Sequence, residues 1–374
     1  MKKASEVFNP FSITSYLGKE YFCDRVKELD TLQSALYNMR NVTLVSPRKM
    51  GKTGLLRHLF ASVPQNEVIT LYVDLDGTAC LKDFIKVFSE ALLNQTFSVT
   101  QKIASGLKSV LSGIRPTLTP NSLTGEMSWS VSVEPYTEQS SLSSLFQYLE
   151  SLSRPCYVAL DEFQRIVDYP EKNMEALLRS HIQHLTNVHF VFAGSQRHLM
   201  SEMFASPARP FFQSTQMMTL SAINEEQYAT FARHHLAKAG ISFSKEGFHS
   251  LYEMLHGHTW YIQCLLNRLY SYRLNLDTSN IQKVIGEIVE ENKNTYILFS
   301  TLLTRNQVEL LRAIAHEGNV TEVSAKDFIQ QYSLGASSSV RNAAKQLIDK
   351  EFLMEENGTY SVYDRFLSLW LANR

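Results

Sequence analysis

Short apolar runs alternate with amphipathic stretches over roughly the first 220 residues of the chain. Four runs have the length and β-branched or aromatic content of buried strands, namely 42–45, 68–75, 155–160 and 188–193. Helical apolar spacing lies around and between them, at 24–39, 55–60 and 81–93. Strands that alternate with helices favour an α/β fold, in which helices cover both faces of a parallel sheet.

A serine- and threonine-rich stretch interrupts this alternation at 98–144 and carries three prolines. Within it, 117–119 and 127–133 alternate polar and apolar residues and flank a turn-rich segment at 120–125. This pattern predicts a protruding β-hairpin inserted between core elements. We expect Trp129 to pack the hairpin onto the core, and a partner-binding anchor is the less favoured alternative.

The chain becomes helical and mixed in charge after Ser221. Helices are predicted at 225–239, 245–255, 260–274 and 278–303. Three more follow at 306–316, 325–332 and 337–350, with Ser337 as N-cap of the last, and 352–362 predicts two strands around an Asn-Gly turn. Three helices and a β-hairpin are typical of a winged helix. We therefore predict domains at 1–220, 221–303 and 304–374.

Candidate chemistry begins where the first predicted strand ends. Residues 46–53 are SPRKMGKT, a P-loop pattern (Walker A) in which serine stands where the first glycine is usual. Backbone N–H groups of such a loop wrap phosphate oxygens at the positive end of a helix. Lys52 would reach the β- and γ-phosphates and Thr53 would bind Mg²⁺. A strand–turn–helix junction with a capping threonine is the alternative. The predicted nucleotide contacts are Ser46, Pro47, Arg48, Lys49, Met50, Gly51, Lys52, Thr53 and Gly54.

Two later strand ends supply partners for this loop. The strand at 155–160 runs into Asp161 and Glu162, the Walker B pattern. Asp161 would hold Mg²⁺, and Glu162 would orient or activate the attacking water. The strand at 188–193 runs into Gly194 and Ser195, and Ser195 is placed to hydrogen-bond a phosphate or that water. A plain core strand with a polar end is the alternative for this third site.

At these three sites the sequence resembles the prokaryotic and archaeal predicted ATPases of the AAA+ superfamily, near the origin-recognition and STAND branches. The segment 22–29 is similar to the family's motif that borders the adenine, which implies that Arg25 contacts the nucleotide, although Asp24 and Val26 replace a glycine and a glutamate of that motif. The segment 256–263 resembles the start of the family's lid helix and adds Gly257 as a nucleotide contact, with Thr259 in place of proline.

The resemblance has further implications for the site. It implies ATP and Mg²⁺ as cofactors, a helical lid behind the core, and an arginine that neutralises transition-state charge, often from a neighbouring subunit. Arg209 and Arg197 are the candidates, and an ordinary surface or ion-paired arginine is the alternative for each. The ending at 363–371 is similar to the family's C-terminal signature, whose aromatic residues we expect to be buried.

Composition narrows the class of protein. A chain of 374 residues with 44% hydrophobic content and a formal net charge of −1 is typical of a multidomain globular protein, without a global field that attracts nucleic acid. Four dispersed cysteines indicate buried residues in a reducing compartment, and the histidine pairs at 181/184 and 234/235 predict no metal site. Without an apolar run of membrane-spanning length or a signal-peptide pattern, we expect a cytoplasmic protein that makes no membrane contact.

Charge also bears on the partner of the predicted winged helix. Residues 304–374 carry eight lysines and arginines against nine acidic residues, and Glu355 and Glu356 lie in the wing itself. Because duplex binding draws on neutralised phosphates, DNA is open as a partner but not favoured. A protein partner at the winged helix or the hairpin is favoured, and a homo-oligomer is left open.

The sequence thus predicts an ATP-binding protein with Mg-dependent hydrolysis, acting as a nucleotide-driven switch through its lid and winged helix. The alternative is a DNA-binding regulator or scaffold that binds ATP with little turnover. The pair Asp161 and Glu162 favours hydrolysis, because a protein that only binds nucleotide needs no water-orienting glutamate.

Overall fold

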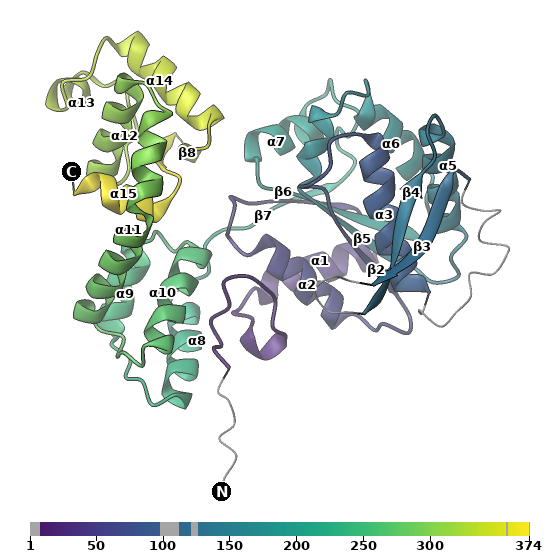
Figure 1. Ribbon diagram of the computed structural model, residues 1–374, viewed down its shortest axis with the longest axis horizontal. Coiled ribbons are helices and arrows are strands. Elements are labelled where there is room, and N and C mark those ends of the chain that lie inside the picture. Colours follow the sequence, from purple (N-terminus) through teal and green to yellow (C-terminus); the bar gives the residue numbers. More distant parts are fainter. Residues whose placement is uncertain (1–7, 98–111, 121–125, 357, 374) are drawn as a thin grey trace, which may run out of the picture. The chain divides into compact units, whose positions relative to one another are not determined.

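The computed structural model of the chain describes residues 8–97, 112–120, 126–356 and 358–373. The chain forms two compact units, Thr14–Ile223 and Asn224–Arg374 with Met1–Ile13 (Figure 1). The predicted domain boundaries at 220 and 303 remain predictions.

A five-stranded sheet, parallel in every pairing, forms the centre of the unit Thr14–Ile223. The four predicted strands are confirmed, and a fifth short strand, β7, was not predicted from sequence. Its residues QMMT are only half buried and lack the apolar run of the other strands. In spatial order the strands are β2 (Ile69–Asp74), β5 (Cys156–Asp161), β6 (Val188–Gly194), β1 (Val42–Val45) and β7 (Gln216–Thr219).

Helices cover both faces of this sheet, as predicted. Alternate residues of β5 face opposite ways, so Tyr157 and Ala159 join one apolar core while Val158 and Leu160 join the other. The first core includes α1 (Val26–Tyr37) and α2 (Lys52–Ser62). The second includes α3 (Leu81–Thr96), α5 (Glu138–Glu150), α6 (Met174–Ile182) and α7 (Arg197–Ala205) (Figure 1). Two short 3₁₀ helices, η1 (Lys19–Tyr21) and η2 (Phe163–Asp168), belong to the same unit.

The predicted hairpin is present as β3 (Ile114–Pro120) and β4 (Met127–Val133), paired antiparallel. Its predicted turn and the segment 98–111 lie outside the described residues. β4 packs against α3 and Trp129 is only 5% exposed, so this strand lies on the core and does not protrude. The expectation that Trp129 packs the hairpin onto the core is confirmed. The predicted irregular stretch also ends too late, since α5 begins at Glu138. Serines weaken the sequence signal of this helix, because their side chains compete for backbone hydrogen bonds. In α5, Ser143 and Ser144 donate to carbonyls of the preceding turn while the helix continues.

The second unit begins with four helices close to those predicted. They are α8 (Glu225–Lys238), α9 (Lys245–Met254), α10 (Thr259–Ser271) and α11 (Thr278–Thr301). The N-terminal segment joins this unit through side-chain amides: Asn9 donates to the carbonyl of Asn267, and Asn267 donates to that of Phe11. These contacts and the burial of Phe11 tie residues 9–11 to α10.

The C-terminal part has three helices and a hairpin, followed by a further helix. They are α12 (Arg305–Glu317), α13 (Lys326–Gln331), α14 (Ser337–Asp349), β8 (Leu353–Glu356), β9 (Thr359–Val362) and α15 (Arg365–Ala372). The predicted N-cap of α14 is wrong, because Ala336 holds that position and Ser337 is the first helical residue. The predicted Asn-Gly turn includes Asn357, which lies outside the described residues. Phe366 and Trp370 of α15 are buried, as expected for the aromatic ending.

Among the described residues, no helix combines the length and apolar character needed to cross a membrane.

Candidate functional site

The predicted phosphate-binding loop follows β1 at the carboxyl edge of the sheet. The loop turns through two left-handed positions, Lys49 (φ 63°) and Gly51 (φ 95°), and α2 begins directly afterwards. Ser46 has no positive φ, is fully buried, and donates its Oγ hydrogen bond to the carbonyl of Pro47 at 3.0 Å. Its backbone N–H binds the carbonyl of Gly194 at 3.2 Å. Serine in the place of the usual glycine therefore introduces no backbone strain.

The acidic end of β5 meets the start of α2. The Lys52 ammonium lies 3.0 Å from Asp161 Oδ1 and 2.7 Å from Glu162 Oε1. Thr53 donates its hydroxyl hydrogen bond to Asp161 Oδ2 at 2.8 Å. Lys52 and Asp161 are buried, so each charge requires the opposite one close by. The parallel register of β1, β6 and β5 brings together residues that are more than a hundred positions apart in sequence.

Glu162 lies at the turn from β5 into η2, in a left-handed conformation with φ 53°. Its Oε2 accepts hydrogen bonds from Ser195 Oγ at 2.7 Å and from Gln164 Nε2 at 2.6 Å. Burial raises the pKa of Glu162, but the charge of Lys52 and the hydrogen bonds from Lys52, Ser195 and Gln164 outweigh it and place the pKa below its usual value. Glu162 is therefore ionised at neutral pH.

Tyr72 on β2 adds a donor that was not predicted from sequence. Its hydroxyl donates to Asp161 Oδ2 at 2.7 Å, and the Arg57 guanidinium carbon lies 3.7 Å from the centre of its ring. Burial, followed by the negative charge of Asp161, raises the pKa of Tyr72, so the phenol stays protonated and remains a donor. Gln164 is the second residue that was missed. The available signal was position alone: Tyr72 lies near the end of a neighbouring strand, and Gln164 lies two residues after Glu162.

Other predicted nucleotide contacts surround the loop. Arg48 Nε lies 3.5 Å from Ser195 Oγ, at the limit of a hydrogen bond. Arg25 is 2% exposed, and its guanidinium donates to the carbonyls of Met50 and Ser221 and to the Glu28 carboxylate. Through the Met50 carbonyl it supports the backbone of the loop. Of the remaining positions, Pro47 and Met50 are buried, Lys49 is exposed, and Gly54 on α2 lies against the ring of Phe22.

Three further candidates, Arg209, Arg197 and Gly257, take no part in the contacts described above. Arg209 is ion-paired with Glu175 at 3.3 Å and Glu202 at 3.6 Å. This is the ion-paired arginine that the sequence left as the alternative to a catalytic role. Arg197 is the first residue of α7. Gly257 belongs to the second unit, where it has φ 65° just before α10. Their contacts with nucleotide remain predictions.

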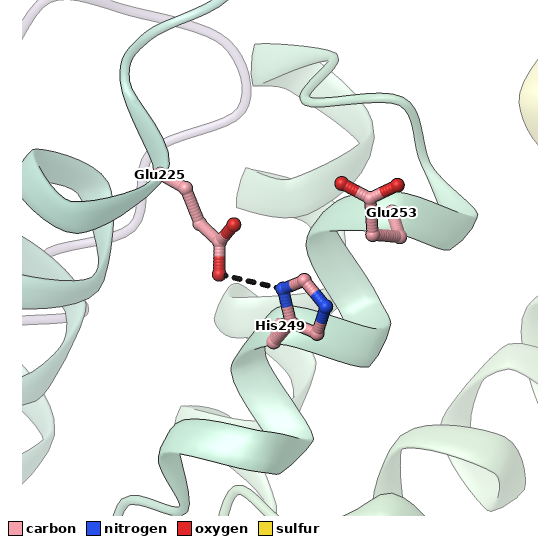
Figure 2. A group of neighbouring side chains, drawn as sticks. All are labelled: Glu225, His249 and Glu253. Atoms are coloured by element: carbon pink, nitrogen blue, oxygen red, sulfur yellow. Dashed lines mark hydrogen bonds and ion pairs between the residues drawn. The ribbon is translucent and has the colours of Figure 1, made fainter.

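Figure 2 shows a second group of potential metal ligands, in the unit that contains α8 and α9. Glu225, His249 and Glu253 place one ligand atom each within 4.8 Å of one another. His249 Nδ1 lies 3.0 Å from Glu225 Oε1, and only this contact is drawn. A contact between the first turn of α8 and the exposed His249 accounts for the grouping, and we assign no metal to it.

Comparisons with known proteins agree with this geometry. Residues 37–201 match the family model of the AAA domain, and residues 294–373 match that of a probable winged helix domain. No curated protein matches the chain significantly. The Walker-type ATPase PABY2304 of Pyrococcus abyssi is similar in structure, with a TM-score of 0.66 at 17% identity, over 97% of this chain and 99% of that one.

A second similar structure is the ORC2 protein of Aeropyrum pernix in its ADPNP–ADP complexes. Its TM-score is 0.61 at 15% identity, over 98% of this chain and 96% of that one. At such identities the structures establish the fold alone. The chain therefore carries an AAA domain with the P-loop ATPase fold and a C-terminal winged helix domain.

Proposed function

We propose that this chain binds ATP with Mg²⁺ and hydrolyses it, and that the nucleotide state acts as a switch on its C-terminal helices. The observation that supports this most is the single polar network at the carboxyl edge of the sheet. It joins the loop lysine, the helix threonine, both acids of the Walker B pattern and the serine after β6, at Lys52, Thr53, Asp161, Glu162 and Ser195.

The donor set suits the metal that this function requires. Thr53 Oγ1 and Asp161 Oδ2 are oxygen atoms 2.8 Å apart at the start of α2, and Mg²⁺ prefers oxygen ligands. Thr53 and Asp161 would hold the ion, in direct contact or through water. When bound, Mg²⁺ neutralises charge on the β- and γ-phosphate oxygens.

The other side chains of the network have separate proposed roles in binding the phosphates and orienting the attacking water. The Lys52 ammonium is paired with two carboxylates, and phosphate oxygens at the loop would compete for it. Glu162, ionised at neutral pH, would accept a hydrogen bond from the attacking water and orient it. Ser195 holds Glu162 from the end of β6. An arginine such as Arg209 would complete the site after leaving Glu175 and Glu202.

The C-terminal winged helix is proposed to contact protein rather than duplex DNA. Arg341 and Lys345 are exposed on α14, but Glu355 and Glu356 of β8 carry the opposite charge in the wing. DNA binding draws its affinity from neutralised phosphates, which an acidic wing opposes. A regulator or scaffold with little turnover is the second candidate, favoured by the exposed basic residues of α14 alone.

Two substitutions test the proposal, with fluorescent ATP binding and phosphate release as readouts. Lys52→Ala is expected to lose ATP binding, because it removes the ammonium proposed to bind the β- and γ-phosphates and leaves Asp161 and Glu162 without its positive charge. Glu162→Gln is expected to keep ATP binding and lose turnover by about a hundredfold or more. Lys86→Ala and Glu67→Gln, both at exposed positions of the same unit, are the matched controls.

Wild-type turnover in Glu162→Gln would exclude Glu162 as the water-orienting group. ATP binding without turnover in the wild type, together with an ATP-dependent shift of duplex DNA at low salt, would favour the regulator instead.

A further inference from the structure

We infer that Gln164 is a positioning residue that holds one oxygen of Glu162, so that only the other oxygen faces the phosphate-binding loop. The inference rests on the proposed function, since it assigns a role within the same site.

The two oxygens of Glu162 have separate sets of partners. Oε1 faces the Lys52 ammonium at 2.7 Å, on the side of the loop. Oε2 accepts from Gln164 Nε2 at 2.6 Å and from Ser195 Oγ at 2.7 Å. Gln164 comes from η2 and Ser195 from the end of β6. Gln164 Nε2 also donates a hydrogen bond to Ser195 Oγ at 3.4 Å. Two donors from independent directions fix the rotation of a carboxylate better than one donor does.

The orientation of the Gln164 amide follows from its partner. An ionised carboxylate only accepts hydrogen bonds, so the amide must direct its nitrogen toward Glu162. The side-chain carbonyl of Gln164 then points elsewhere, and it finds no donor among the described residues. It lies against Gly194 instead, where a Cβ atom would come within 2.5 Å of it.

Glutamine at position 164 is thus unfavourable for the stability of the fold. It is 1% exposed, and a buried carbonyl without a donor costs on the order of 1–3 kcal/mol. An apolar side chain of the same length would fill this space without that cost. What glutamine adds is the N–H directed at Glu162.

The separation of the two oxygens bears on the proposed reaction. Without nucleotide, Lys52 occupies Oε1, the oxygen on the loop side. When Lys52 turns to phosphate, Oε1 is released and can accept the hydrogen bond of a water. Gln164 and Ser195 keep Oε2 throughout, so Glu162 does not rotate as its other partner leaves. A base held in one orientation lowers the entropic part of the barrier.

The experiment replaces Gln164 with methionine, which keeps the length of the side chain and removes the donor. In Gln164→Met we expect kcat for ATP hydrolysis to fall about tenfold, with KM for ATP changed less than about twofold. A fall in kcat without a matching change in KM is expected for a residue that positions Glu162 and does not contact ATP. Gln33→Met, on α1 and away from the site, is the matched control.

Other charges near Glu162 are left intact by this substitution. They are Lys52 on α2, Asp161 and Asp74 at the ends of β5 and β2, Arg165 on η2, and Arg48, which reaches Ser195. A lower kcat in Gln164→Met alone therefore reports the lost amide donor.

Two outcomes would overturn the inference. One is wild-type kcat in Gln164→Met. The other is a loss of thermal stability with no change in kcat, which would show that Gln164 only fills space. Gln164→Glu serves as a second variant: its added carboxylate should repel Glu162 and lower kcat further.

A separate measurement works without turnover. A crystal structure of nucleotide-free Gln164→Met should show the Glu162 carboxylate turned from the orientation it has in the wild type and in Gln33→Met, because Oε2 has lost one of its two donors. An unchanged orientation contradicts the inference even if ATP is hydrolysed. Failure of the wild type to hydrolyse ATP refutes the proposed function but leaves this comparison decisive for Gln164.

Discussion

At the scale of single residues, the end of β6 is shaped by the absence of a side chain at Gly194. A Cβ there would come within 2.5 Å of both Gln164 Oε1 and Met200 Sδ. Both neighbours are buried, and Gln164 is also held by Glu162. The close approach of β6 to η2, which places Ser195 on Glu162, therefore requires glycine at this position.

Gly194→Ala should accordingly destabilise the protein by about 1–3 kcal/mol, the usual cost of overpacking. It should also lower ATP turnover, because the added methyl group pushes Gln164 away from Glu162. Urea unfolding and phosphate release measure the two effects.

Gly77→Ala is the matched control, since a Cβ at Gly77 meets no atom within 4 Å and its φ lies outside the left-handed range. We expect it to change stability by less than about 0.5 kcal/mol. Equal effects of the two substitutions would contradict the packing argument at Gly194.

At the scale of elements, α3 holds the β3–β4 hairpin by imitating a neighbouring strand. The side-chain amide of Asn94 both donates to the carbonyl of Trp129 and accepts from its N–H, at 3.1 and 2.8 Å. Glu90 Oε1 accepts from the N–H of Val131 at 2.9 Å. With these groups satisfied, Trp129, Val131 and Val133 turn their side chains into the core shared with α3.

Trp129→Ala should therefore cost about 3–5 kcal/mol in the free energy of unfolding, because it empties a large buried site. Chemical denaturation followed by circular dichroism measures this cost.

Leu118→Ala, at the position paired with Trp129 across the hairpin, is the control, since Leu118 is 37% exposed. We expect it to cost less than about 1 kcal/mol. A small cost for Trp129→Ala would instead mean that the hairpin contributes little to the fold and would revive the partner-binding alternative for Trp129.

At the scale of the whole molecule, the net charge is only −1, so overall charge repulsion is small near neutral pH. The change in the free energy of unfolding as the pH falls then depends on individual buried groups. His58 and His189 are both 7% exposed, and burial lowers the pKa of each, with the charge of Lys19 adding to the effect at His58. A histidine whose pKa is lowered by folding stabilises the native state above its unfolded pKa, near 6.5. That contribution is lost as the pH falls toward the folded pKa.

We therefore expect the free energy of unfolding to fall between pH 7.5 and 5.5. The loss per histidine is at most about 1.4 kcal/mol for each pH unit below the unfolded pKa. Urea unfolding at several pH values measures the slope. His189→Gln, which does not titrate, should make the slope shallower, and a slope that is the same in both proteins would contradict the assignment.

Much of the fold was predictable because its signals are local. The apolar strands, the amphipathic helices and the three-helix-plus-hairpin ending each follow from spacing within about twenty residues. The elements that were missed or misplaced have weak local signals: β7 is short and half exposed, and α5 is rich in serine.

The site divides in the same way. Lys52, Thr53, Asp161, Glu162 and Ser195 were predicted, because each stands at a strand end or helix start within a recognisable pattern. Gln164 and Tyr72 were not, because their roles depend on which strands are neighbours. The parallel order β2, β5, β6 brings Tyr72 to Asp161 and Ser195 to Glu162, across 89 and 33 residues of sequence.

The sequence by itself thus determined the chemical groups of the candidate phosphate site and the elements that carry them, because the loop, the strand end and the helix start each consist of consecutive residues. Only the tertiary structure decided how these groups are paired: which oxygen of Glu162 faces Lys52, and which is held by Gln164 and Ser195. Such pairing depends on strand order and on the close packing of η2 against β6 at Gly194, and short-range sequence patterns carry no information about either.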